Sequence, residues 1–250
     1  MNNNKEYKKV LFVFDLDNTL TLTGGDFSTF ELLKVKDKGK ELLSLWPKLS
    51  WCDIINLLMK EFKKQNTTIE EIKYQIQRNL LNPGMFELLS YIKENKEKAD
   101  IILVSGSNII SIEWQLQSFK LDDGFFKKIF ANPSSISLEN LIEVGSYSLN
   151  DCSNSNCEKD MCKKLIVEDY LNACSQNGQN YLKTIYVGDG TNDYCPGTIL
   201  TKSDILFPRH NFPLFKMLFE SEQPNSLLCE IVPWNDGFQI LNYIKSNKLI

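Results

Sequence analysis

An apolar run that ends in two closely spaced acids most strongly limits what this chain can fold into. The run Val10–Phe14 is rich in β-branched and aromatic residues, and Asp15 and Asp17 follow it. We predict a buried strand with both acids at its carboxyl end, the edge where open α/β sheets bind ligands. Side chains two residues apart on an extended chain point the same way, so the two carboxylates should address one small volume.

Two neighbouring acids have more than one use. They can hold a divalent cation through oxygen ligands, or act as a nucleophile and a proton carrier. A surface turn after a strand explains a bare Asp-x-Asp about as well. The threonine that follows at position 19 makes a chance match rarer. Because two uncompensated acids repel each other, the pattern favours a site that binds a cation.

Short β-rich runs recur along the chain, and helical patterns lie between them. We expect strands at 9–14, 101–104, 184–187, 204–207 and 229–232, and helices at 84–96, 108–119, 160–174 and 235–246. Strands that alternate with helices of this length predict an α/β fold with a Rossmann-like, mostly parallel sheet and helices on both faces. A hairpin is a further prediction for residues 136–149.

The alternation stops between residues 26 and 81, where only helical patterns such as 51–62 and 69–81 occur, and Pro83-Gly84 ends the segment. A helical insert directly after the acidic loop can cover the strand edge, exclude water and select substrates. We therefore predict a core of residues 1–24 and 84–250 and a small helical cap of residues 25–83. The alternative is that these helices extend the core.

Charge and composition exclude several classes of partner. The chain has 250 residues and a formal net charge of -4, without a block of basic residues, so we expect neither nucleic acid nor a membrane surface as partner. The first nine residues are polar, unlike a secretory signal, and no apolar run reaches membrane-spanning length. An odd number of cysteines, seven, suits a reducing compartment. We expect a cytoplasmic protein.

Three of the cysteines are clustered as Cys152-x4-Cys157-x4-Cys162. Such a group can hold a soft metal such as zinc. The spacing differs from the Cys-x2-Cys pairs of common zinc sites, no fourth cysteine is near, and His210 is distant in sequence. Thiols without a metal are the expectation, and a structural metal is the alternative.

Polar residues also follow the later strands. Ser105 and Gly106 come at the start of a helix, where a hydroxyl and backbone N–H groups can bind a phosphate or serve as an ordinary cap. Asp189 and Asp193 follow the strand at 184–187, so that Asp15 and Asp189 can offer oxygen ligands to Mg²⁺. Lys163, on the preceding helix, can supply a fixed positive charge.

The order of these motifs resembles the haloacid dehalogenase superfamily of phosphohydrolases: Asp-x-Asp-x-Thr, then Ser, then Lys, then Gly-Asp-Gly-x-Asn-Asp. The flanking sequences resemble the phosphoethanolamine/phosphocholine phosphatase and pyridoxal phosphate phosphatase group over nearly the whole chain. These flanks are Asn132-Pro133-Ser134, the cysteine cluster up to Lys163, Tyr186 to Pro196, Phe207-Pro208-Arg209 and Val232-Pro233-Trp234.

The resemblance implies separate roles for the acids. Asp15 attacks phosphorus and forms an aspartyl phosphate, and Asp17 protonates the leaving alkoxide and then deprotonates the hydrolytic water. Mg²⁺ is implied at Asp15, Asp189 and the backbone carbonyl of Asp17, with Asp193 as a further ligand or an orienting group.

The same resemblance implies that Ser105, the Gly106 N–H and Lys163 hold the phosphoryl oxygens, and that Asp26 contacts the substrate. Where the family has Ser-Asp, this chain has Ser105-Gly106, so one carboxylate fewer is offered to an ammonium head group.

We accordingly expect a Mg²⁺-dependent phosphomonoesterase that acts on a small phosphorylated metabolite. The substrate stays open between phosphoethanolamine, phosphocholine, pyridoxal phosphate and another ester. The alternatives are a phosphotransferase or mutase of the same superfamily and a non-catalytic phosphate-binding module.

Overall fold

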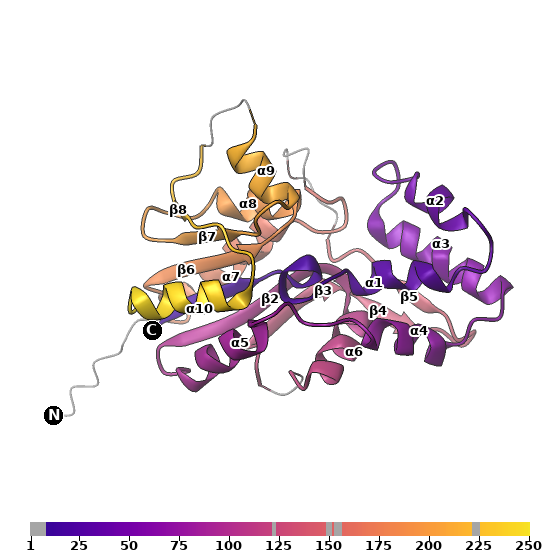
Figure 1. Ribbon diagram of the computed structural model, residues 1–250, viewed down its shortest axis with the longest axis horizontal. Helices are drawn as coiled ribbons and strands as arrows, with labels where there is room; N and C mark the ends of the chain where they lie inside the picture. Colours follow the sequence, from indigo (N-terminus) through magenta and orange to yellow (C-terminus); the bar gives the residue numbers. More distant parts are fainter. Residues whose placement is uncertain (1–8, 122–123, 149–151, 153–156, 222–225) are drawn as a thin grey trace.

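A parallel sheet forms the centre of the molecule (Figure 1). The structure is a computed structural model that describes residues 9–121, 124–148, 152, 157–221 and 226–250. The six strands run parallel in the order β3-β2-β1-β6-β7-β8. Their bounds are β1 (Val10–Phe14), β2 (Ala99–Asn108), β3 (Lys128–Asn132), β6 (Lys183–Gly188), β7 (Ile205–Pro208) and β8 (Glu230–Ile231). The predicted α/β fold with a mostly parallel sheet is confirmed.

Helices cover both faces of the sheet. Because side chains alternate along a strand, Phe12 and Phe14 pack against α5, α6 and α10, whereas Leu11 and Val13 pack against α7 and α9. The helices are α1 (Gly25–Ser28), α2 (Lys38–Leu43), α3 (Trp51–Lys64), α4 (Ile69–Gln77), α5 (Met85–Glu94), α6 (Ile109–Phe119), α7 (Lys163–Gln176), α8 (Tyr194–Gly197), α9 (Pro213–Phe219) and α10 (Gly237–Ser246). The result is an α/β/α sandwich with two apolar cores.

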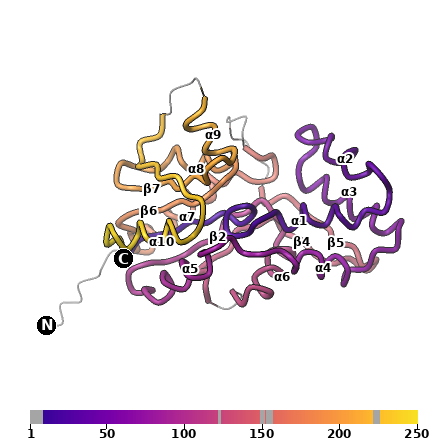
Figure 2. The backbone as a smooth tube through the Cα atoms, viewed as in Figure 1, coloured from indigo at the N-terminus to yellow at the C-terminus, as the bar shows by residue number. Residues whose placement is uncertain are grey.

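A third apolar cluster lies outside this sandwich. Helices α2, α3 and α4 pack there together with Trp114 of α6 and with an antiparallel hairpin of β4 (Ser134–Ile136) and β5 (Ile142–Val144). Figure 2 shows the chain leaving the sheet after β1, passing through α1 to α4 and returning to α5. The outgoing and returning connections between the sheet and the helical segment lie side by side, because Thr21 and Leu81 form an isolated antiparallel bridge.

Several predicted bounds are wrong. Helix α4 ends at Gln77 and not at residue 81, because the chain straightens to pair Leu81 with Thr21. Helix α7 begins at Lys163 and not at residue 160, because the Asp160 carboxylate accepts hydrogen bonds from the Cys52 N–H and the Ser146 hydroxyl. Strand β3 and helix α9 were not predicted. The end of the hairpin expected at 136–149 lies outside the described residues.

Within the described residues, no helix is both long and apolar enough to cross a membrane.

At the amino end of the sheet, the carboxylate of Asp100 in β2 accepts hydrogen bonds from side chains of three other segments. Its carboxylate oxygens lie 3.0 Å from Lys9 Nζ, 2.7 Å from Lys127 Nζ and 2.8 Å from the Tyr181 hydroxyl. Burial raises the pKa of Asp100, but the bonds to Lys127, Tyr181 and Lys9 outweigh it and lower the pKa from 3.8 to about 2. The ionised carboxylate is therefore the form that the fold stabilises.

We predict that Asp100→Asn lowers the free energy of unfolding at pH 7 by about 1–2 kcal/mol, after allowance for solvent screening. Because the folded-state pKa is depressed, this contribution is complete above the unfolded value of 3.8 and disappears as the pH falls to about 2. Urea unfolding of both proteins at pH 7 and in this acidic range measures it. Asp169→Asn, on the exposed surface of α7, is the matched control. An equal loss at both pH values would contradict the assignment to charge.

Candidate active site

The carboxyl ends of β1, β2 and β6 meet at one edge of the sheet. Phe14, the last residue of β1, pairs with Leu103 on one side and Val187 on the other. The Asp15 N–H donates to the Val187 carbonyl at 3.0 Å, so the chain leaves β1 still paired with β6. Parallel register therefore places the residues after these three strands next to one another.

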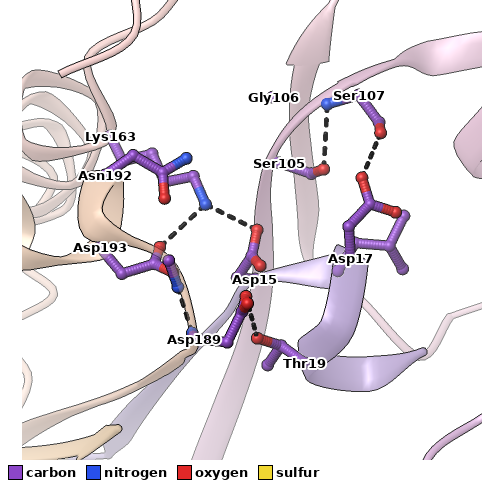
Figure 3. A network of polar contacts seen from close by, with 12 residues as sticks. Asp15, Asp17, Thr19, Ser105, Gly106, Ser107, Lys163, Asp189, Asn192 and Asp193 are labelled. Atoms are coloured by element: carbon purple, nitrogen blue, oxygen red, sulfur yellow. Dashed lines mark hydrogen bonds and ion pairs between the residues drawn. The ribbon is translucent and has the colours of Figure 1, made fainter. Parts of the chain in front are cut away.

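Three buried carboxylates and one lysine form the centre of this edge (Figure 3). Asp15, Asp189 and Asp193 each offer an oxygen, and these oxygens lie within 4.8 Å of one another. Lys163, the first residue of α7, places Nζ at 2.6 Å from Asp15 Oδ1 and 2.8 Å from Asp193 Oδ1. Four residues that the motifs predicted as a group are thus brought together.

The cluster has more negative than positive charge. Burial, with the neighbouring Asp193, raises the pKa of Asp15 to about 7 against the opposing effect of Lys163. Burial and the charges of Asp15 and Asp193 raise the pKa of Asp189 to about 9. Although burial acts against it, the pKa of Lys163 is raised well above its ordinary value because Asp15 and Asp193 stabilise its charged form. One ammonium does not balance three carboxylates.

This donor set fits a hard divalent cation. Carboxylate oxygens are the ligands that Mg²⁺ prefers, and three lie within 4.8 Å of one another here. The charge of the ion would offset the burial and the repulsion that raise the pKa values of Asp15 and Asp189. Thr19 donates its hydroxyl hydrogen to Asp189 Oδ1 at 3.2 Å, which orients that carboxylate.

Asp193 is the most constrained acid of the cluster. Its Oδ1 accepts from Lys163 and from the Tyr186 hydroxyl at 2.7 Å, and its Oδ2 accepts from the N–H groups of Asp189 and Gly190 at 3.0 Å. A Cβ on Gly188 would lie 2.5 Å from the Asp193 Cγ, so glycine is needed for this approach. This arrangement suits an orienting group better than an open metal ligand.

Asp17 lies apart from the three-carboxylate cluster. Asp17 has extended backbone angles (φ -71°, ψ 127°) but lies within the turn Leu16–Leu20, where Asn18 has a positive φ of 58°. Its carboxylate accepts from the Ser107 hydroxyl (Figure 3). It also accepts from the Gly25 N–H at 3.0 Å. Burial outweighs these bonds and raises the pKa of Asp17 to about 6. A carboxyl with such a pKa can give and take a proton near neutral pH.

The end of β2 presents polar groups to the same region. The Ser105 hydroxyl accepts a hydrogen bond from the Ser107 N–H at 3.1 Å, which leaves its own hydrogen to be donated. The Gly106 carbonyl accepts from Asn132 Nδ2 at 2.7 Å, which fixes the peptide. A Cβ at position 106 would lie 2.4 Å from Glu158 Oε2, so a side chain there would displace Glu158.

A cavity of about 410 Å³ joins these groups. Its walls include Asp15, Asp17, Ser105, Gly106, Lys163 and Asp189 from the predicted set. Phe27 and Trp51 line it from the helical segment at 25–77. The volume and the mixed lining are those of a site for a small molecule.

Sequence reasoning missed several residues of this cavity. Ser107 has the same i, i+2 relation to Ser105 that Asp17 has to Asp15, so its position could have been found. Asn192 belongs to the Gly-Asp-Gly-x-Asn-Asp motif but was given no role, and Glu158 had no sequence signal. Asn192 Nδ2 donates to Glu158 Oε1 at 2.7 Å, and burial raises the pKa of Glu158 to about 7 while Lys163 acts against the shift. Glu158 adds a further acid to the cavity wall.

The structure does not bring Asp26 to the cavity. Its buried carboxylate accepts from Asn108 Nδ2 at 2.8 Å and from the Asn108 N–H at 3.3 Å, and it is absent from the cavity lining. These bonds tie α1 to the start of α6, beneath the site.

Arg209 has a structural role beside the site. Its guanidinium donates to the Asn18 carbonyl and, at 2.8 Å, to Asn82 Oδ1, and it stacks over Phe212 and Trp234. Arg209 therefore links the turn that carries Asp17 to the connection at Asn82, where the chain returns from the helical segment to the core.

Comparison with known proteins agrees with this geometry. Residues 10–247 match the family model described as "Putative Phosphatase". Pyridoxal phosphate phosphatase PHOSPHO2 of Bos taurus is 31% identical over 238 residues, which cover 95% of this chain and 98% of that protein. The phosphoethanolamine/phosphocholine phosphatase of Gallus gallus is 29% identical over 242 residues, which cover 95% and 88%.

A solved structure described as a phospho-aspartyl intermediate analogue of phosphoserine phosphatase shares the fold. Its TM-score is 0.60 at 22% identity, and the match covers 94% of this chain and 99% of that one. With the family match over nearly the whole length, these relatives make the chain a phosphatase of the haloacid dehalogenase superfamily, in the group that contains the pyridoxal phosphate and phosphoethanolamine/phosphocholine phosphatases.

Proposed function

We propose that this phosphatase is a Mg²⁺-dependent phosphomonoesterase that hydrolyses a small phosphorylated metabolite through an aspartyl phosphate on Asp15. The observation that carries the proposal is the position of Asp15. Its buried carboxylate lies in the Lys163, Asp189 and Asp193 cluster and also lines the cavity that Ser105 and Gly106 border. A nucleophile, a cation site and phosphate-binding donors therefore share one small volume.

Donors from two elements are available for the phosphoryl group. The Ser105 hydroxyl hydrogen and the Gly106 N–H come from the end of β2, and Lys163 Nζ comes from the start of α7. Such preorganised donors stabilise the charge that spreads over the phosphoryl oxygens during transfer. Asp15, Asp189 and the Asp17 backbone carbonyl would hold Mg²⁺, with Asp193 orienting them, and the bound ion would offset the same charge.

Transfer proceeds in two displacements. In the first, an Asp15 oxygen forms a bond to phosphorus as the bond to the ester oxygen breaks, and Asp17 gives its proton to the leaving alkoxide. In the second, Asp17 takes a proton from a water molecule, whose oxygen attacks phosphorus and releases Asp15 and phosphate. Its bonds to Ser107 and Gly25 hold Asp17 in place, apart from the buried cluster, for both proton transfers.

Residues 25–83 act in this proposal as the cap. Phe27 and Trp51 face the cavity from that segment, and the bridge between Thr21 and Leu81 joins the two connections to the core. The apolar rings exclude water from the reacting groups, and the modest cavity restricts the site to small esters.

Replacement of the nucleophile tests the mechanism. We predict that Asp15→Asn lowers turnover of p-nitrophenyl phosphate by at least about a thousandfold, because the amide cannot form the acyl phosphate. Steady-state assays with circular dichroism spectra check activity and fold together, and Asp169→Asn is the charge-matched control. Turnover near the unsubstituted level in folded Asp15→Asn would refute the covalent route.

Metal dependence is the second prediction. Brief chelation should abolish hydrolysis, and Mg²⁺ should restore it whereas Ca²⁺ should not, because Ca²⁺ demands more ligands at longer distances. Asp189→Asn should raise the Mg²⁺ concentration for half-maximal activity by about tenfold or more. Full activity in chelator, or an unchanged Mg²⁺ requirement in Asp189→Asn, would show that the acidic cluster does not bind the ion.

Glu158 gives a prediction for substrate choice. Its carboxylate on the cavity wall disfavours an ester whose leaving group carries a further negative charge. We predict that Glu158→Gln raises kcat/KM for phosphoglycolate relative to phosphoethanolamine by about five- to tenfold, equivalent to about 1 kcal/mol. Parallel kinetics with both esters measure the ratio. An unchanged ratio would place Glu158 outside the selection of substrate.

A further inference from the structure

We infer that Cys152, Cys157, Cys162 and Cys195 form a structural zinc site beside the active site. Their four sulfur atoms lie within 4.8 Å of one another. Two of the separations are 3.5 Å, between Cys152 and Cys195 and between Cys157 and Cys162. The sequence showed three of these residues and no nearby fourth, and the fold supplies Cys195 from the helix that follows β6.

The distances between the sulfur atoms match those around a tetrahedral zinc ion. Four thiolates around Zn²⁺ at about 2.3 Å place neighbouring sulfurs about 3.8 Å apart. The observed pairs at 3.5 Å and the upper limit of 4.8 Å span this value. Two disulfides would need sulfurs about 2.0 Å apart in each pair and would not require all four to converge. The structure has these side chains as thiols.

The four ligands come from two parts of the chain, the segment that leads into α7 and the helix α8. Cys152 and Cys157 are half-buried in the segment before α7, Cys162 is the buried N-cap of α7, and Cys195 is buried in α8. Half-buried ligands on one side and buried ones on the other let an ion enter from solvent and be enclosed on the protein side. A site with four protein ligands is closed to substrate, as structural zinc sites are.

The position of the cluster suggests what the ion does. Cys162 directly precedes Lys163, and Cys195 follows Asp193 by two residues. A metal bound to both would clamp the start of α7 to the loop after β6, which are the two segments that the Lys163–Asp193 ion pair at 2.8 Å joins. The cysteines are therefore positioning residues that act through Lys163 and Asp193, and the proposal stands whichever ester the active site hydrolyses.

Metal content tests the site directly. Untagged full-length protein, purified without chelator and with Mg²⁺ present throughout, is analysed by elemental mass spectrometry. We expect about one zinc per chain, because one tetrathiolate site binds one ion. Cys157→Ser and Cys195→Ser should each lose most of it. Cys174→Ser, which changes a half-buried cysteine of α7 outside the cluster, should keep it.

Spectroscopy and thermal stability give readouts that do not depend on catalysis, and the spectrum needs no variant. Replacement of zinc by Co²⁺ in the unsubstituted chain should produce thiolate-to-metal charge transfer and the visible bands of a tetrahedral site. A zinc-selective chelator in excess Mg²⁺ should lower the Tm of the unsubstituted protein and of Cys174→Ser by at least about 5 °C, and should leave the Tm of Cys157→Ser unchanged.

Several results would overturn the inference. Zinc far below one per chain in protein grown with ample zinc would do so, as would equal zinc content in Cys157→Ser and the unsubstituted chain. Stoichiometric iron would reject zinc as the occupant. An intact mass lower by two hydrogens for each bond, with thiols recovered only after reduction, would show disulfides in place of a metal site.

Discussion

Lys163 places a buried ammonium between Asp15 and Asp193, and the geometry of the active site depends on this ion pair. Removal of one partner from a buried pair costs about 3–5 kcal/mol, because it leaves the other charge without compensation. The surroundings hold each partner in place: Tyr186 and two backbone N–H groups fix Asp193, and the start of α7 fixes the lysine. The whole network therefore fixes the position of Asp15, the proposed nucleophile.

The parallel register of the sheet makes this network possible. Asp15 and Asp189 are far apart in the sequence. They lie close together because Phe14 and Val187 are register partners in neighbouring parallel strands. Ser105 arrives on the other side of Asp15 through the pairing of Phe14 with Leu103. The buried side chains of β1 alternate between two separate apolar cores and so fix this register, since a slip of one residue would exchange the faces.

Residues placed by this register could be predicted from the sequence, and residues placed by irregular segments could not. The apolar runs before Asp15, Ser105 and Asp189 predict strands, and the order of the motifs predicts that Lys163 belongs to the same site. Asp15 and Asp17 line one cavity, as their spacing predicted, but the turn over Leu16–Leu20 and the bonds of Asp17 to Ser107 and Gly25, which set its carboxylate apart from the three-carboxylate cluster, could not be predicted. The pairing of Asp26 with Asn108 depends on how α1 meets α6, and the approach of Cys195 to the other three cysteines depends on how α8 packs on α7.

The residues at the phosphoryl-transfer centre and the residues that border the rest of the cavity come from different kinds of element. Asp15, Ser105 and Asp189 lie at strand ends, where the hydrophobic pattern of the strands fixes the backbone that carries them. The groups that border the rest of the cavity, Phe27, Trp51 and Glu158, come from a short helix, a helix start and a loop outside the sheet. Because these three residues lie outside the sheet, we expect substitutions there to change which ester fits while Asp15 keeps its position.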